Sequence, residues 1–374
     1  MQRIVFWQDS ISIVQAALIR NMAAHPECEV TLVAEKGITQ HRLRMGWSNP
    51  DFGNAKLEVV PNDETIEQLI FREPYRTVHI FSGMRAYPMV WSAFKRCLSG
   101  QAKIGIFSES ANWLGIKGKL RLFRSLADAI RFRRRIDFIL AVGHLGVRWF
   151  NMSGYPQEKI YPFGYFVEKP LSLEAEIQDF RCIGREGVHL CFIGEFIRRK
   201  GLNVALKALG TLKNLDWSFL VIGDGSEKTK LETLSIALGL TGRVSFLGTL
   251  RNEEAMCTLA GCDLLILPSR WDGWGAVVNE ALMRGVRVIC TNYCGAADLV
   301  NSPERGCVVK ARSVGSLKSV MESWIRKGPI KPEAHARIRK WSQCIEGDAV
   351  ADYLLRIIDH IKTGGPRPRA PWLS

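Results

Sequence analysis

Short apolar runs alternate with amphipathic helical patterns along almost the whole chain, and this alternation limits the folds that it can adopt. In the first half, strands are predicted over six ranges: 3–7, 29–33, 57–60, 77–81, 103–107 and 137–142. After an irregular stretch, interpreted as a linker at about 165–187, the rhythm resumes with strands such as 189–193, 217–222, 263–267 and 286–290. Such alternation predicts α/β architecture with doubly wound parallel sheets. A length of 374 residues favours two domains.

The composition is that of a globular chain with a surplus of basic residues. Hydrophobic residues make up 47% and charged residues 24%, values that allow a sizeable core. No apolar run approaches the roughly 20 residues of a membrane span, and the opening MQRIVFWQDS turns polar too early for a secretory signal. Ten scattered cysteines, without a CxxC pair, favour reduced thiols in a cytosolic protein. The net charge of +14 indicates an anionic partner, either nucleic acid or an acidic membrane surface.

One segment, 117–135, combines this charge with an apolar stripe. Its sequence, KGKLRLFRSLADAIRFRRR, places Leu120, Phe123, Ala127 and Ile130 at helical spacing among basic residues. A basic amphipathic helix of this kind suits an anionic bilayer surface, which is the preferred partner. The alternative is an ordinary surface helix whose apolar stripe faces the core. Nucleic acid is not expected, because no RNP, helix-turn-helix or zinc-finger pattern accompanies the charge.

The stretch 269–300, SRWDGWGAVVNEALMRGVRVICTNYCGAADLV, carries the most informative motif. It predicts a loop, a helix, a buried strand and a turn. Gly273 and Gly275 stand where the loop enters the helix, so backbone N–H groups there can approach a ligand closely. Two carboxylates flank this position, Asp272 before the helix and Glu280 within it.

This stretch resembles the donor-binding signature of the retaining glycosyltransferases of family 4 (glycosyl transferases group 1), which have the GT-B fold. The family's pattern has two acids separated by seven residues around a glycine-flanked turn. Here Glu280 is the second acid, and Asp272 replaces the usual first glutamate. The resemblance is dense over 188–309 and only architectural before it.

The resemblance implies two Rossmann-like doubly wound domains that face each other across a cleft. The expected division is an acceptor-binding domain at 1–168, a nucleotide-sugar-binding domain at 169–342, and a helix at 343–362 that returns to the first domain. Residues 363–374, rich in proline, glycine and arginine, are expected to form a disordered tail.

The resemblance also assigns donor-binding residues. Lys200 would hold the nucleotide diphosphate, while the family's arginine position in the same loop carries Glu195. The missing positive charge would then come from Arg198 or Arg199. Further contacts to the donor are expected from Gly194, Gly223, Val244, Gly273, Gly275, Ala276 and Val277.

Three carboxylates would act on the sugars. By resemblance, Glu280 would accept hydrogen bonds from the ribose, and Asp272 would hold the transferred sugar. Glu109 follows the strand 103–107, where it would orient or deprotonate an acceptor hydroxyl. The alternative for Glu109 is that residues 108–110 only cap the next helix. No D-x-D motif is present, so neither a metal ion nor another cofactor is implied.

These features predict a hexosyltransferase that moves a sugar from a UDP- or GDP-linked donor to a hydroxyl of a glycan or lipid-linked acceptor. Its expected place is bacterial surface polysaccharide or lipopolysaccharide synthesis, at the inner face of the cell membrane. Two alternatives stay open. One is a nucleotide-sugar epimerase of the same fold. The other is a non-catalytic binding or scaffold subunit, favoured by Glu195 and by the missing glycine-rich loop after the first strand. An oxidoreductase is disfavoured, because no G-x-G-x-x-G motif follows the first strand of either half.

Overall fold

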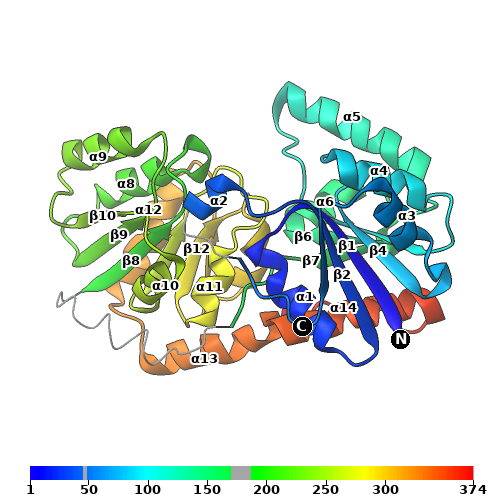
Figure 1. Cartoon of the computed structure of the whole chain (residues 1–374). Helices are drawn as coiled ribbons and strands as arrows, with labels where there is room; N and C mark the ends of the chain where they lie inside the picture. The colour runs from blue at the N-terminus through cyan, green and yellow to red at the C-terminus, as the bar shows by residue number, and fades with distance from the viewer. Residues whose placement is uncertain (45–48, 170–186, 374) are drawn as a thin grey trace. The chain divides into compact units, whose positions relative to one another are not determined.

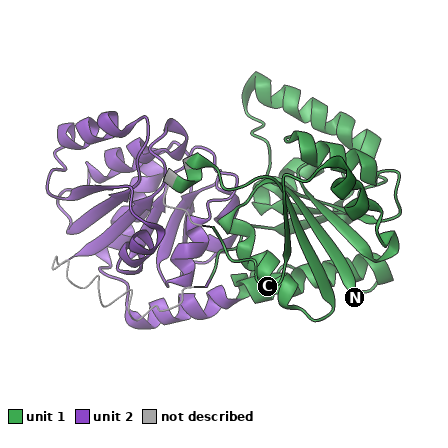
Figure 2. Cartoon of the chain, in the orientation of Figure 1, with its two compact units in different colours: residues 1–43, 48–168, 344–374 green, residues 44–47, 169–343 purple. Residues whose placement is uncertain are grey.

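The computed structural model describes residues 1–44, 49–169 and 187–373. The chain divides into two compact units (Figure 2): unit 1 contains residues 1–43, 48–168 and 344–374, and unit 2 contains residues 44–47 and 169–343. Most of the predicted linker at 165–187 lies outside the described residues. Among the helices that are described, none is both long enough and apolar enough to cross a membrane.

Unit 1 is built on a seven-stranded parallel sheet with the order β3-β2-β1-β4-β5-β6-β7. Its strands are β1 (Gln2–Ser10), β2 (Cys28–Lys36), β3 (Lys56–Val59), β4 (Thr77–Ser82), β5 (Lys103–Ser108), β6 (Phe138–Val142) and β7 (Ile160–Phe163). The central strands are buried almost throughout, because helices cover both faces of a parallel sheet. The strand order reverses between β1 and β4, and ligands in such sheets bind at the carboxyl ends near this switch point.

Helices lie on both faces of this sheet (Figure 1). They are α1 (Ala16–Ala24), α3 (Asp63–Phe71), α4 (Pro88–Cys97), α5 (Gly115–Phe132), α6 (Gly143–Met152) and α14 (Gly347–Thr363), and a further short helix, α2 (Gln40–Arg44), follows β2 in the chain. The α14 helix follows unit 2 in the chain and packs beside α1 on one face. On the other face, α3, α4, α6 and the end of α5 enclose a core that includes Trp7, Phe81 and Phe94.

The expectation of a disordered tail at 363–374 is wrong where the tail is described. Trp372 is only 4% exposed. Its ring centroid lies 5.2 Å from that of Phe166 and 5.7 Å from that of Tyr353. Burial of this large aromatic side chain offsets part of the conformational entropy that is lost when the segment becomes ordered, and composition alone does not reveal such an anchor.

Unit 2 has a six-stranded parallel sheet with the order β10-β9-β8-β11-β12-β13. Its strands are β8 (Val188–Ile193), β9 (Trp217–Ile222), β10 (Val244–Gly248), β11 (Leu264–Leu267), β12 (Arg287–Thr291) and β13 (Gly306–Val309). Its helices are α8 (Leu202–Leu209), α9 (Lys228–Ala237), α10 (Asn252–Ala260), α11 (Val277–Met283), α12 (Val314–Arg326) and α13 (Pro332–Ser342). The α8 helix packs against α9 and α12, while α11 packs against α10 and α13. The predicted class, two Rossmann-like doubly wound parallel sheets, is confirmed.

Candidate functional site

Two loops at the carboxyl edge of the unit 2 sheet form the centre of the candidate site. They follow β8 and β11, which are neighbours in the sheet. The backbone N–H of Arg270 donates to the carbonyl of Arg199 at 2.8 Å, and Nη1 of Arg199 donates to the carbonyl of Trp271 at 3.1 Å. These hydrogen bonds hold the basic loop 198–201 against the loop that contains Asp272.

Asp272 is the charged centre of this site and is only 6% exposed. Its Oδ2 accepts from Nζ of Lys200 at 2.7 Å and from the hydroxyl of Ser269 at 3.2 Å. Nη1 of Arg199 lies 3.7 Å from Oδ1. A buried carboxylate needs such partners, because the loss of hydration is otherwise costly. The structure therefore brings together three predicted residues, Lys200, Arg199 and Asp272. Ser269, the first residue of the stretch 269–300, was not among the predicted site residues.

The glycine-flanked turn leads from Asp272 into α11. Gly275 has a φ of 92°, and a Cβ there would lie 2.8 Å from Cδ2 of Leu267 and 3.0 Å from Sγ of Cys294. Only glycine fits this position without strain. The first helical hydrogen bond of α11 runs from the N–H of Val278 to the carbonyl of Gly275. The backbone from Gly273 through Ala276 and Val277 thus forms the turn and the entry to the helix.

Glu280 lies one turn into α11 and is half-buried. Burial raises the pKa of its carboxyl group, and the nearby charge of Arg284 partly offsets this effect. Nη1 of Arg284 donates to the backbone carbonyl of Glu280 at 3.3 Å. The carboxylate of Glu280 is thereby suited to accept hydrogen bonds from a ligand in a partly dry environment.

The ends of β8 and β9 complete this edge. A side chain at Gly223, whose φ is 135°, would overlap the carbonyl oxygen of Gly194, so these two predicted residues lie in contact. The prediction for Val244 was wrong. Val244 begins β10 and pairs with Phe219, so it lies at the amino end of the sheet, where it packs against the core. Gly248 lies at the carboxyl end of this strand. The direction of the strand was the sequence signal that could have identified this end as the one at the ligand edge.

Glu109 belongs to unit 1, where it follows β5 and is exposed. The hydroxyl of Tyr165 donates to Glu109, and burial together with the charge of Glu109 raises the pKa of Tyr165 well above its ordinary value. Burial and the charges of Asp9 and Glu109 also raise the pKa of Tyr87. The interpretation of residues 108–110 as a helix cap is wrong, because Leu114 occupies the N-cap position of α5.

The α5 helix of unit 1 carries two apolar stripes on opposite sides. Gly118, Ala129 and Phe132 are buried and face the core. The predicted stripe is a different one and faces solvent: Leu120 is 66% exposed, Phe123 75% and Ile130 75%, and Ala127 is exposed as well. Ile116, just before the predicted segment, extends this stripe and is 80% exposed. The one acidic residue of α5, Asp128, is bound by Arg85 with hydrogen bonds of 2.6–2.9 Å. The positive charges of α5 therefore lack an acidic partner within their own helix.

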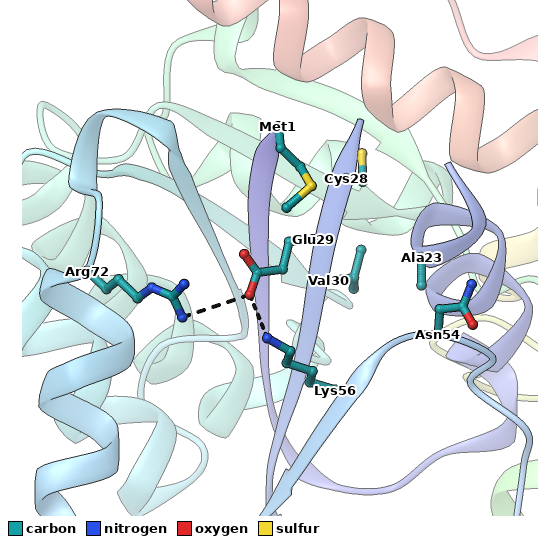
Figure 3. A pocket seen from close by; sticks show the side chains of 8 residues that line it. All are labelled: Met1, Ala23, Cys28, Glu29, Val30, Asn54, Lys56 and Arg72. Atoms are coloured by element: carbon teal, nitrogen blue, oxygen red, sulfur yellow. Dashed lines mark hydrogen bonds and ion pairs between the residues drawn. The ribbon is translucent and has the colours of Figure 1, made fainter. Parts of the chain in front are cut away.

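A cavity of about 430 Å³ lies elsewhere in unit 1, among the first residues of β1, β2 and β3 (Figure 3). This is the amino edge of the sheet, opposite to the edge that carries Glu109. Its carboxylate, Glu29, already accepts from Nζ of Lys56 at 2.8 Å and lies 4.0 Å from Nη1 of Arg72. The charged groups that line this cavity bind one another, so the cavity adds no group to the candidate site.

Solved glycosyltransferases of the GT-B type share this fold, and the chain is similar to that class in its architecture. Anabaena HepE, whose structure contains UDP, superposes with a TM-score of 0.70 at 15% identity and covers 95% of this chain and 98% of its own. The galactosyltransferase WaaB of the lipopolysaccharide outer core superposes with a TM-score of 0.68 at 14% identity, covering 96% and 99%.

The sequence comparison is more specific. Residues 183–341 match the model of the family described as glycosyl transferases group 1. An uncharacterized glycosyltransferase of Methanocaldococcus jannaschii is 25% identical over 162 residues, which are 42% of this chain and 45% of the relative. The 2-deoxystreptamine glucosyltransferase of Streptomyces kanamyceticus is 29% identical over 153 residues, 40% and 39% of the two chains. The chain thus spans less than half the length of these curated relatives, and the matched part supports the glycosyl transferases group 1 family.

Proposed function

We propose that the protein is a retaining glycosyltransferase of the family 4 type that uses a nucleotide-diphosphate sugar. The observation that carries this proposal is the cluster that Lys200 and Arg199 form around the buried Asp272, which lies within the segment that matches the group 1 family. UDP is the first nucleotide to test, because HepE is described in complex with UDP and with UDP-glucose. GDP is the second, because one relative is named as a GDP-mannose-dependent mannosyltransferase.

In the proposed reaction, the bond between the anomeric carbon and the diphosphate oxygen breaks while a bond to the acceptor oxygen forms on the same face. The acceptor proton passes to the leaving phosphate, so the anomeric configuration is retained. Lys200 and Arg199 stabilise the negative charge that develops on the diphosphate, which is the largest electrostatic demand of the step. In this proposal no metal ion or other cofactor takes part.

The two acids of the motif then have separate roles. Glu280 accepts hydrogen bonds from the ribose, for which its half-buried position in α11 is suited. Asp272 binds hydroxyls of the transferred sugar and keeps Lys200 in place through the 2.7 Å ion pair. Asp272 is shorter than glutamate by one methylene, and its backbone N–H donates to the carbonyl of Tyr293 at 2.8 Å, which fixes the position of the loop.

The acceptor is proposed to bind at the carboxyl edge of unit 1, where Glu109 orients its hydroxyl. Glu109, Asp9, Tyr87 and Tyr165 interact there, and such groups recognise neutral hydroxyls well. A glycan or lipid-linked acceptor, as in surface polysaccharide or lipopolysaccharide synthesis, fits the exposed stripe of α5. This helix is proposed to hold the enzyme at the anionic inner face of the membrane.

Calorimetric titration of the full chain with UDP, GDP, ADP and dTDP tests the donor site. We expect one nucleoside diphosphate to bind, and Glu280→Ala to weaken it at least tenfold through loss of charge-assisted hydrogen bonds of about 1.5–3 kcal/mol. Glu333→Ala, which removes an exposed carboxylate from α13 of the same unit, is the matched control and should bind as the wild type does.

A screen of donor sugars on the bound nucleotide follows, with detection of the released diphosphate and of the anomeric configuration of the product. Binding without transfer to any hydroxyl acceptor, but with interconversion of the donor, would support the epimerase instead. If no nucleoside diphosphate binds, even with anionic lipid present, the transferase proposal fails and the scaffold hypothesis replaces it.

A further inference from the structure

Trp274 and Asn279 form a buried hydrogen bond that joins the glycine-flanked turn to α11. Trp274 stands between the two glycines of the turn and is 2% exposed, while Asn279 lies within α11 and is 0% exposed. Nε1 of Trp274 donates to Oδ1 of Asn279 at 2.9 Å. The indole N–H of a buried tryptophan needs an acceptor, and this amide supplies it. A side chain of the helix thus holds a side chain of the turn.

Asn279 is an unfavourable residue for a buried position in a helix. Its Nδ2 has no hydrogen-bond partner among the described residues, and an unpaired amide donor is costly to bury. Asparagine is also a poorer helix former than leucine. The apolar residues Val278 and Ala281 beside it in α11 are buried, so an apolar side chain would suit the surroundings better. The hydrogen bond to Trp274 is the contribution that no apolar residue could make.

The loop after β12 fixes the same turn through the backbone. The carbonyl of Trp274 accepts from the N–H of Ala296 at 2.9 Å and from Sγ of Cys294 at 3.0 Å. The carbonyl of Asp272 accepts from the N–H of Gly295 at 3.0 Å. These contacts hold residues 272–274 against the loop, whereas the bond from the indole to the amide holds them against α11.

We infer that Asn279 is a positioning residue that sets the spacing between the two acids of the donor site. The inference rests on the proposed function, in which Asp272 binds the transferred sugar and Glu280 binds the ribose. Asp272 lies two residues before Trp274 on the turn, and Glu280 directly follows Asn279 in α11. The sugar and the ribose of one donor are joined by a diphosphate of limited span, so both acids contact them only when turn and helix keep a fixed spacing. Asn279 is fully buried, so it acts through Trp274.

Calorimetric titration of the full chain with UDP and with UDP-glucose tests the inference, or with the equivalent pair if the donor screen selects another nucleotide sugar. The variants are Asn279→Leu, Trp274→Phe and the two combined. The combined variant replaces both partners by apolar groups, so it keeps the test available if a single variant unfolds. The matched control is Trp217→Phe, which removes another buried indole donor: its Nε1 donates to the carbonyl of Leu212 at 2.8 Å, at the amino end of β9. Thermal unfolding verifies that each protein is folded.

We expect the variants of Asn279 and Trp274 to bind UDP with an affinity close to that of the wild type, because Glu280 and α11 stay in place. Their affinity for UDP-glucose relative to UDP should fall roughly tenfold, as for the loss of a hydrogen bond from a sugar hydroxyl to the carboxylate of Asp272. The combined variant should lose no more than either single variant, since the same hydrogen bond is absent from all three. Trp217→Phe should keep the wild-type ratio, although it too loses a buried hydrogen bond.

The positioning role and the proposed function fail in different ways. The inference is overturned if Asn279→Leu keeps the wild-type ratio, or if it weakens UDP and UDP-glucose equally, which is the result of a merely structural role. If that happens while Glu280→Ala still weakens UDP, the positioning role alone fails and the transferase proposal stands. If the wild type binds no nucleoside diphosphate, the inference falls together with the transferase proposal.

Discussion

The exposed stripe of α5 allows a quantitative prediction for membrane binding. Phe123 is 75% exposed and Leu120 is 66% exposed. Complete burial of such a side chain contributes about 1.5–3 kcal/mol, so the exposed fraction of each corresponds to about 1.5 kcal/mol. Phe123→Ser should therefore weaken partition into anionic vesicles roughly tenfold, and Leu120→Ser with Phe123→Ser should weaken it roughly a hundredfold.

The basic residues beside the stripe should contribute a separable part. Arg121 and Arg124 are both exposed. Each positive charge near an anionic surface contributes about 1 kcal/mol, so Arg121→Gln with Arg124→Gln should cost about 2 kcal/mol, roughly thirtyfold in partition. This effect should shrink in high salt, where the Debye length is short. On vesicles of neutral lipid it should be absent.

Vesicle co-sedimentation with phosphatidylcholine alone, and with added phosphatidylglycerol, measures both parts. Ile236→Ser is the matched control, because Ile236 is also on a helix and is 69% exposed, but lies on α9 of unit 2. Neither substitution removes a buried group, so the melting temperature should change little. The reasoning is refuted if Phe123→Ser partitions as the wild type does, or if Ile236→Ser loses as much.

Three further predictions concern charged groups. Asp272→Asn should lower the free energy of unfolding by about 3 kcal/mol, because it leaves Lys200 without its buried partner; urea denaturation measures this, and additivity with Lys200→Met would contradict a direct pair. Nucleoside diphosphate affinity should fall as the pH drops through the raised pKa of Glu280, because its charge-assisted hydrogen bonds are lost on protonation; titration at several pH values should show no such step for Glu280→Gln. Burial lowers the pKa of His79 from 6.5 to about 3. Below pH 6.5 the unfolded chain therefore binds a proton at this histidine, whereas the folded chain does not. Stability should thus fall by about 2 kcal/mol between pH 6.5 and 5, and a pH profile unchanged in His79→Asn would contradict this.

The sequence predicted the two sheets because burial on both faces of a parallel sheet forces continuous apolar strands. It predicted the Asp272 loop for a similar local reason, since glycines such as Gly275 are needed where no side chain fits. Both features depend on residues close together in the chain. Val244 was misplaced because it begins its strand, whereas ligands bind at the carboxyl ends of parallel strands.

Contacts between residues far apart in the chain could not be predicted from the sequence. The hydrogen bond between Tyr165 and Glu109 joins residues from different strand ends, and no spacing rule relates them. The α5 helix shows the same limit, because the apolar residues at 118, 129 and 132 and those at 116, 120, 123 and 130 both recur at helical spacing. Only the packed structure decides which stripe meets the core. The exposure of the second stripe is therefore a finding of the structure.

The replacement of the family's arginine by Glu195 is the feature that most favours a non-catalytic scaffold, and the Asp272 cluster argues against that hypothesis. An ion pair as buried as Asp272 and Lys200, with side chains 9% and 17% exposed, is seldom more stabilising than apolar residues of the same size. A chain that only needed to keep its fold would gain little from this pair. Arg199 lies 3.7 Å from the same carboxylate and brings a guanidinium to the loop in which the family's arginine would stand. The positive charge that Glu195 omits is thus present four residues later, in the loop to which we assign the diphosphate.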